Sequence, residues 1–211
     1  VAESDERYIT ADIARYGSDL VTVFVWVGTK AVDISYYTKK STTETAQIIR
    51  DKSITHQVPR SHILVDEDGI GGGVVDALPG CRGFMGGLAP LPDRNGEHLN
   101  YQNLKAQCSY KIAEMVQAHK LALRTKDVFI HERIAEELQQ VRRRNEDKDG
   151  KLAIVPKDEV KKALGRSPDF ADAIMMRAYF EINKPVERIV EKQPMYQKEL
   201  ETWNRSRQKT I

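Results

Sequence analysis

Residues 62-HILVDEDGIGGGVVDAL-78 contain an apolar run, three consecutive acidic residues and four glycines before the sequence becomes apolar again. The run 62–66 is typical of a strand inside a sheet, and 71–78 has the pattern of a short helix. The acids at 66–68 stand where the strand ends, although neighbouring carboxylates repel one another. Two interpretations follow: the acids bind something positively charged, or the segment is a solvated turn.

The sequence before this stretch predicts three strands and a helix. The strands are expected at residues 8–14, 20–28 and 31–39, joined by short turns. Residues 42–57 have a threonine cap, a following glutamate and apolar residues at helical spacing, which predict a helix. Three antiparallel strands, a helix and a fourth strand parallel to the first is the ribonuclease H-like order. We therefore expect an α/β fold with a mixed central sheet flanked by helices and an added β-hairpin.

The sequence after this stretch predicts mainly helices. Residues 79–98 are rich in glycine and proline and are expected to be a loop without a core of its own. Helices are predicted at 100–120, 132–143 and 168–183, a short extended segment at 122–129, and a hairpin with an Asp-Gly tip at 141–157. We expect one domain over 1–183, followed by a polar, loosely attached tail over 184–211.

Composition excludes several classes of protein. The chain has 211 residues, a formal net charge of +2 and two cysteines. Two thiols in a chain of this length argue against a disulfide scaffold and favour a reducing compartment. The sequence has neither a long apolar run nor a signal peptide, so no membrane association is expected. Because it begins with Val1 rather than Met, we expect it to be a piece of a longer protein.

Four aspartates stand at positions where the predicted fold would bring them together. Asp12 is near the end of the first strand, Asp66 ends the fourth, and Asp169 and Asp172 share one face of the last helix. Hard carboxylate oxygens suit Mg²⁺ or Mn²⁺ rather than zinc. Two such ions can activate water and stabilise the leaving oxygen in phosphodiester hydrolysis. No serine–histidine or cysteine–histidine pattern competes for this role.

Each aspartate also has a simpler interpretation. Asp12 could cap a turn, and Asp68 before a glycine is better explained as a turn residue than as a metal ligand. Asp169 could interact with the helix dipole, being in the first turn. Asp172 is different, because an unpaired acid in an apolar helix is costly. The joint placement of the four, rather than any one of them, favours a metal site.

Several motifs resemble the C-terminal nuclease domain of the large terminase subunit of headful-packaging tailed bacteriophages. The similarity runs in order over about residues 8–182, through 8-YITADIARYGSDLVTVFVW-26, the stretch 62–78, 103-NLKAQCSYKIAEMV-116 and 165-GRSPDFADAIMMRAYF-180. The resemblance implies a ribonuclease H-like nuclease that cuts concatemeric double-stranded viral DNA during packaging, with two Mg²⁺ or Mn²⁺ ions. It implies Asp12, Asp66 and Asp169 as catalytic ligands. Asp172 lies in the same motif, and the sequence leaves open whether it or Asp169 is nearer to the metal.

Basic residues indicate where DNA would bind. Arg142, Arg143 and Arg144 begin the predicted hairpin, and Lys105 lies on the predicted helix 100–120. A solvated hairpin tip is an equal alternative, because acidic residues follow the arginines. The sequence has no Gly-x-x-x-x-Gly-Lys-[Ser/Thr] phosphate loop. The resemblance implies an N-terminal packaging ATPase in the same polypeptide, the small terminase subunit and the portal as partners, and a location in the host cytoplasm during virion assembly.

Three other functions stay open at this point. An actin-like ATP-binding phosphotransferase shares the strand order, but the turn after Asp12 lacks the small residues that cradle phosphates. A non-catalytic module that docks a portal or procapsid would leave the convergent acids unexplained. A junction resolvase or transposase of the same fold fits the motifs less well than a terminase does.

Overall fold

The computed structural model describes residues 6–13, 20–93, 95–144 and 150–183. The predicted tail 184–211 and the hairpin tip 145–149 lie outside these ranges. The strands are β1 (Arg7–Asp12), β2 (Val21–Val27), β3 (Lys30–Tyr37), β4 (Ile63–Asp66), β5 (Arg82–Phe84) and β6 (Ala122–Leu123). The helices are α1 (Thr42–Thr55), the 3₁₀ turn η1 (Arg60–His62), α2 (Gly71–Ala77), α3 (Leu104–Gln117), α4 (Val128–Gln140), α5 (Lys157–Leu164) and α6 (Asp169–Ile182). In this described part of the chain, no helix has the length and apolar character that a membrane span requires.

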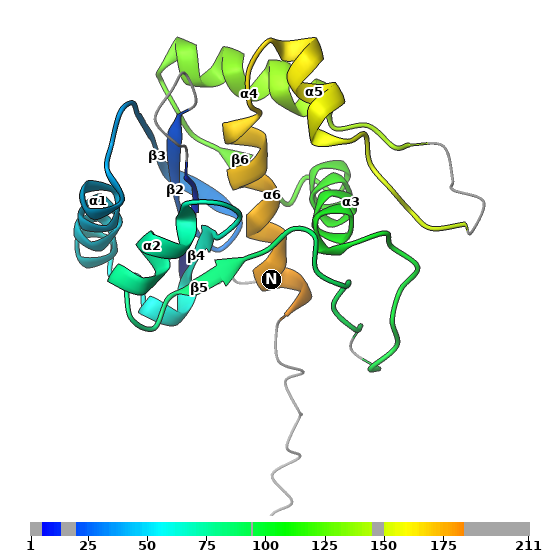
Figure 1. Cartoon of the computed structure of the whole chain (residues 1–211), viewed down its shortest axis with the longest axis horizontal. Helices are drawn as coiled ribbons and strands as arrows, with labels where there is room; N and C mark the ends of the chain where they lie inside the picture. Colours follow the sequence, from blue (N-terminus) through cyan, green and yellow to red (C-terminus); the bar gives the residue numbers. More distant parts are fainter. Residues whose placement is uncertain (1–5, 14–19, 94, 145–149, 184–211) are drawn as a thin grey trace, which may run out of the picture.

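The strands form one mixed sheet in the order β5-β4-β1-β2-β3-β6 (Figure 1). β1, β2 and β3 pair antiparallel, while β4 pairs parallel to β1 with Ala11 opposite Val65. The predicted mixed sheet and the ribonuclease H-like order are therefore confirmed. β5 and β6 extend the two edges in parallel pairing with β4 and β3.

Successive side chains along each strand point to opposite faces of the sheet, and a separate apolar core covers each face. On β1, Ile9 and Ala11 belong to the core under α1 and α2, whereas Tyr8 belongs to the core under α6. Because successive strand side chains point to opposite faces, Thr10 and Asp12 lie on the α6 face with Tyr8. The Trp26 indole N–H of β2 donates to the Thr10 hydroxyl at 3.0 Å, which satisfies both polar groups inside this core.

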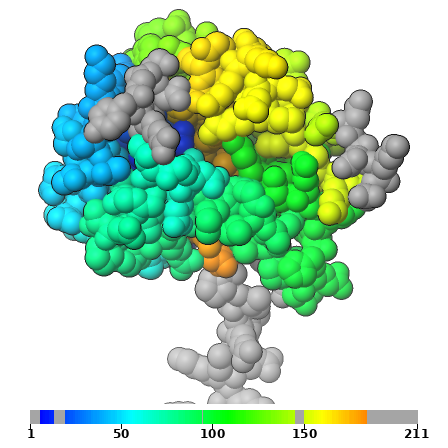
Figure 2. All heavy atoms as spheres, in the orientation of Figure 1, coloured from blue at the N-terminus to red at the C-terminus, as the bar shows by residue number. Residues whose placement is uncertain are grey.

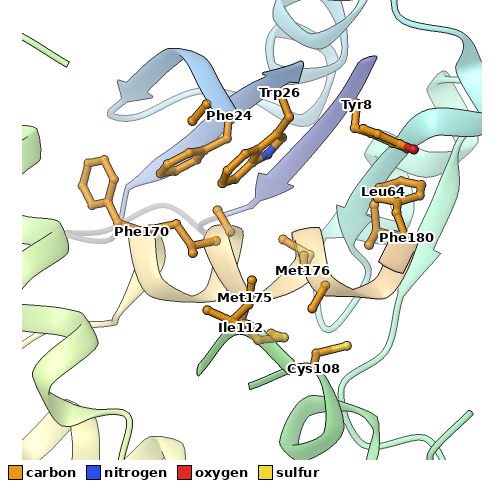
Figure 3. Packing of buried hydrophobic residues seen from close by; sticks show 14 of the residues in the cluster. Tyr8, Phe24, Trp26, Leu64, Cys108, Ile112, Phe170, Met175, Met176 and Phe180 are labelled. Atoms are coloured by element: carbon orange, nitrogen blue, oxygen red, sulfur yellow. The ribbon is translucent and has the colours of Figure 1, made fainter. Parts of the chain in front are cut away.

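α6 is the central helix of the larger core. Eleven of its fourteen residues are buried, because the sheet covers one side and α3 and α4 cover the other. Figure 3 shows the rings of Phe24 and Trp26 directed at α6 from the sheet, and Cys108 and Ile112 of α3 approaching it from the opposite side. A helix buried on all sides has little freedom to rotate, so its polar residues are held in fixed directions.

Some elements differ from the prediction. The region 79–98 has no core of its own, but it contains the short strand β5, which was not predicted, and its Phe84 joins the core under α6. The cap of α1 is Ser41 rather than a threonine, with Glu44 completing a capping box. α5 was not predicted as a helix. The flanks of the hairpin do pair antiparallel, with Arg143 opposite Ile154, but over too few residues to form named strands.

A buried arginine connects α6 to the sheet by hydrogen bonds. Arg177 is 0% exposed, and its guanidinium donates two hydrogen bonds to the Gly28 carbonyl at 3.0 and 2.6 Å. It also donates to Glu181 at 2.9 Å and lies 4.2 Å from the centre of the Tyr8 ring. The planar fork makes all these contacts at once, which a lysine ammonium does not.

We expect Arg177→Lys to destabilise the domain. The lysine keeps the charge but leaves the carbonyl and the ring contact poorly satisfied, at a cost of about 2 kcal/mol. Urea unfolding of the variant, beside Arg82→Lys at an exposed position of β5, measures the difference. Equal unfolding midpoints for the two variants would contradict the fastening role.

Candidate active site

Two aspartates end neighbouring parallel strands. β1 ends at Asp12 and β4 ends at Asp66, one residue beyond the paired Ala11 and Val65. Side chains two residues apart on a strand point to the same face of the sheet. Asp12 therefore lies on the same face as Tyr8, and Asp66 on the same face as Leu64, which is the face that α6 covers. The side chain of Asp12 is nearly inaccessible, at 4% exposed, whereas Asp66 is half-buried.

The glycines after Asp66 allow the chain to turn at once into α2. Gly69 has φ of +91°, in the left-handed region that side chains disfavour. A Cβ on Gly71 would lie 1.6 Å from the Asp66 carbonyl oxygen, so only glycine lets α2 start this close to the strand end. Asp68 completes the turn by donating its amide to Asp66 Oδ1 at 3.2 Å. The glycines are thus required by the turn, and the turn presents Asp66.

The third carboxylate comes from α6. Asp172 is 7% exposed, and each of its oxygens accepts a hydrogen bond from a lysine. Lys105 of α3 lies 2.7 Å from Oδ1, and Lys157 of α5 lies 2.9 Å from Oδ2. Three elements that are distant in sequence therefore meet at this side chain.

The electrostatics of the three acids are unequal. Burial raises the pKa of Asp12 well above its usual value, and the charges of Asp172 and Asp66 raise it further. Burial also raises the pKa of Asp66, against a hydrogen bond with Asp12 that lowers it. Burial acts to raise the pKa of Asp172 too, but Lys105 and Lys157 outweigh it, so this pKa is lowered. Asp172 is thus held ionised, while Asp12 has too little compensating positive charge nearby.

The structure separates Asp169 from Asp172, which the sequence left open. The Asp169 carboxylate accepts a hydrogen bond from the Leu20 amide at 2.7 Å, and its carbonyl accepts one from the Thr22 hydroxyl at 2.9 Å. Its charge acts on Asp12 more weakly than those of Asp172 and Asp66. Asp172 is therefore the α6 acid whose charge acts more strongly on Asp12, while the Asp169 carboxylate is bonded to the backbone before β2. This difference arises because Asp169, the first residue of α6, packs against Thr22 of β2.

A cavity of about 360 Å³ opens over this cluster. Asp66 and Asp172 line it together with residues from β5, the start of α3 and the segment before α5. In Figure 2, orange atoms of α6 are visible at the bottom of a depression between the yellow α5 region and the green segments. Asp12 is buried beside the cavity rather than lining it. Among the described residues of the lining there is no Ser, Thr, Cys, Tyr or His that could act as a nucleophile.

The donor set suits a hard divalent cation. Within the described ranges, no three His, Cys, Asp or Glu side chains are already arranged to coordinate a metal ion. Both oxygens of Asp172 are instead bound by Lys105 and Lys157, which bring positive charge to the cluster. Carboxylate oxygens are the donors that Mg²⁺ and Mn²⁺ prefer.

The four predicted DNA-binding residues have different surroundings. Arg144 lines the cavity, as does Lys105, although the ammonium group of Lys105 is bound to Asp172. Arg142 donates to the Gln139 carbonyl at the end of α4, at 2.9 Å. Arg143 lies over the Tyr110 ring of α3, 5.3 Å from its centre. All three arginines are exposed, but only Arg144 borders the cavity.

Sequence reasoning missed Lys157. Its pairing with Asp172 depends on how α5 packs against α6, which no sequence pattern near Lys157 indicates. Its pKa is raised, since Asp172 and Asp12 outweigh the opposing effect of burial. No local motif indicates such a contact.

The raised pKa of Asp12 and the lowered pKa of Asp172 predict that replacing each residue by asparagine changes the stability of the metal-free domain in opposite directions. The Asp12 pKa is raised on folding, so the stability that it contributes is present below its unfolded pKa and is lost as pH rises. Asp12→Asn should therefore stabilise the metal-free domain at pH 8, by about 1–3 kcal/mol. The Asp172 pKa is lowered, so its contribution is present at neutral pH and is lost as pH falls. Asp172→Asn should destabilise by about 1–3 kcal/mol, since Lys157 is partly exposed and screened.

Thermal unfolding with a chelator present, at pH 8 and at pH 4, measures both effects. Each kcal/mol corresponds to roughly 2–4 °C for a domain of this size. The Asp12→Asn difference should shrink at pH 4, near the unfolded pKa of an aspartate, whereas the Asp172→Asn difference should persist there, because the folded pKa of Asp172 is lower still. Shifts of the same sign for the two variants at pH 8 would show that the charge assignment is incorrect.

The fold and the site can be compared with known proteins. No protein-family model and no curated protein matches the sequence. Among solved structures, the chain is similar to the nuclease domain of the large terminase subunit gp2 of bacterial virus Sf6. The identity is 23%, the TM-score is 0.70, and the match covers 83% of this chain and 88% of that one. Other structures of the Sf6 domain are with manganese and beta-thujaplicinol, and with calcium.

A second solved structure has the same arrangement. The large terminase nuclease from thermophilic phage G20c is 15% identical, with a TM-score of 0.54, and the match covers 82% of this chain and 81% of that one. The described part of this chain therefore has the ribonuclease H-like fold of the nuclease domains of phage large terminase subunits.

Proposed function

We propose that this chain is the nuclease domain of a large terminase subunit, and that it cuts double-stranded viral DNA during genome packaging. One observation carries the proposal: Asp12, Asp66 and Asp172 converge beside a cavity whose described lining offers no serine, threonine, cysteine, tyrosine or histidine. Hydrolysis by water is the chemistry that such a site can support. The manganese and calcium in structures of the similar Sf6 domain support a divalent cation here as well.

The three carboxylates would hold two Mg²⁺ or Mn²⁺ ions. When bound, such ions lower the pKa of water and neutralise charge on a phosphodiester. Asp66 and Asp172 line the cavity and would face the cations, while the buried Asp12 would close the cluster from the side of the sheet. Lys105 and Lys157 hold Asp172 in place until it binds the cation, and their ammonium groups would then be available to a phosphate.

DNA would approach over the open side of the cavity. Arg144 borders it and carries a charge that no described side chain pairs with, so it is suited to bind a backbone phosphate. The apolar residues beside it, Ile154 and Val155, would cover the sugar–phosphate edge rather than read bases. Cleavage with little sequence preference follows from this lining.

The same proposal includes the partners that the sequence implies. An N-terminal packaging ATPase in the same polypeptide would move the DNA that this domain cuts, with the small terminase subunit and the portal as further partners. Such assembly takes place in the host cytoplasm. The actin-like alternative depends on the turn after β1, at residues 14–19, which lie outside the described residues.

We expect cleavage of plasmid DNA that depends on Mn²⁺ or Mg²⁺ and ends when EDTA is added. Asp12→Asn, Asp66→Asn and Asp172→Asn should each lower the rate by more than about 100-fold, since each removes a direct ligand. Asp169→Asn should lower it much less, because an amide oxygen can still accept from Leu20. Asp76→Asn, at an exposed position of α2, is the control.

Three results would contradict this proposal or a part of it. Undiminished cutting in excess EDTA would exclude a divalent-metal mechanism. Wild-type rates in the three ligand variants would instead favour the non-catalytic docking module. Loss of activity in Asp169→Asn but not in Asp172→Asn would reverse the assignment on α6.

DNA binding should depend on Arg144 more than on its neighbours. Arg144→Ala should weaken affinity and reduce the slope of log affinity against log salt by about one unit, as expected for one lost phosphate contact. Arg142→Ala and Arg143→Ala should change the slope less, because their guanidinium groups contact Gln139 and Tyr110. Fluorescence anisotropy over a salt series measures all three, in Ca²⁺ to suppress cutting. Equal slopes for the three variants and the parent would indicate that the arginines are only a solvated surface.

A further inference from the structure

The start of α6 lacks a cap of its own. Its N-cap residue is Pro168, whose side chain makes no capping hydrogen bond. The first turn of any helix has backbone N–H groups without an intrahelical partner, and leaving them unsatisfied inside a protein is costly. Asp169 is the nearest acid that could cap the helix, but its carboxylate accepts from Leu20 of the neighbouring segment.

Glu137 supplies the missing cap from a different helix. This residue of α4 is 2% exposed, and its Oε2 accepts a hydrogen bond from the Ala171 amide at 3.0 Å. The Phe170 amide also donates to the carboxylate. Positive charge is close, since Arg166 lies 3.6 Å from Oε1. Two adjacent amides of the first turn are thus held by one buried carboxylate.

The capped amide adjoins the Asp172 ligand. Ala171 immediately precedes Asp172, whose own N–H donates to the Pro168 carbonyl at 2.9 Å and so begins the helical hydrogen bonds. On the opposite side, the Thr22 hydroxyl of β2 holds the Asp169 carbonyl at 2.9 Å. The first turn is therefore held between α4 and β2, and its rotation sets the direction of the Asp172 carboxylate.

We propose that Glu137 is a positioning residue of the metal site: by capping the first turn of α6, it fixes the Asp172 carboxylate relative to Asp12 and Asp66. This inference rests on the proposed function. Glu137 does not line the cavity over which the DNA is proposed to approach. Its effect passes through two backbone amides to the neighbouring ligand.

The test uses Glu137→Gln and Glu137→Leu beside Glu132→Gln, an exposed position on the same helix. Mn²⁺ binding to each protein without DNA is followed by electron paramagnetic resonance of the free ion. Cleavage is measured over a series of Mn²⁺ concentrations, and melting temperature reports stability. Glutamine keeps the size of the side chain and can accept one amide hydrogen bond, so this variant tests position with little loss of packing.

We expect Glu137→Gln to weaken Mn²⁺ binding about 10-fold, which is the loss typical of replacing a residue that orients a metal ligand. Glu137→Leu should weaken the binding further. Saturating Mn²⁺ should restore most of the cleavage rate of Glu137→Gln, while DNA affinity stays that of the parent. Unchanged Mn²⁺ binding in both variants, with only a lower melting temperature, would overturn the positioning role. Absence of Mn²⁺ binding by the parent itself would instead refute the proposed function, and the inference with it.

Discussion

The parallel pairing of β1 with β4 is the constraint on which the site depends. It brings the ends of two strands side by side, and the period of two along each strand directs Asp12 and Asp66 to the same face of the sheet. A shift of one residue in this register would turn one carboxylate into the other core and bury it among aliphatic side chains. The two apolar cores therefore fix the register, and the register places the acids.

Burying three carboxylates requires positive charge, and the fold supplies it from two helices outside the sheet. Lys105 of α3 and Lys157 of α5 both contact Asp172, which ties these helices to α6. The compensation is uneven, because no lysine among the described residues is bound to Asp12, whose pKa is raised by burial. This imbalance is a property of the metal-free protein, and a cation placed among the three acids would remove it.

The central position of α6 makes this helix a rigid support for the acids that it carries. It packs against the sheet on one side and against α3 and α4 on the other, as Figures 1 and 3 show. Arg177 fastens its later turns to the carbonyl of Gly28, and Glu137 caps its first turn. A ligand on this helix is therefore held at both ends of the element that carries it. Rigid support of this kind suits a site in which small displacements are costly.

The sequence alone determined the order of strands β1 to β4, the helices α1, α2, α3, α4 and α6, and the two strand-end acids, because hydrophobic periodicity and turn residues act over short distances. Gly69 and Gly71 could be interpreted from sequence for the same reason. The choice of Asp172 over Asp169, the contact of Lys157 and the cap from Glu137 could not. These three features depend on contacts between elements that are far apart in the chain. The packing of α6 between the sheet and two helices decides which side chains make those contacts. Short segments such as β5 were also missed, since three residues carry too little pattern to outweigh the surrounding glycines. Local sequence thus specified the longer elements and the acids at the strand ends, and packing decided which side chains meet them.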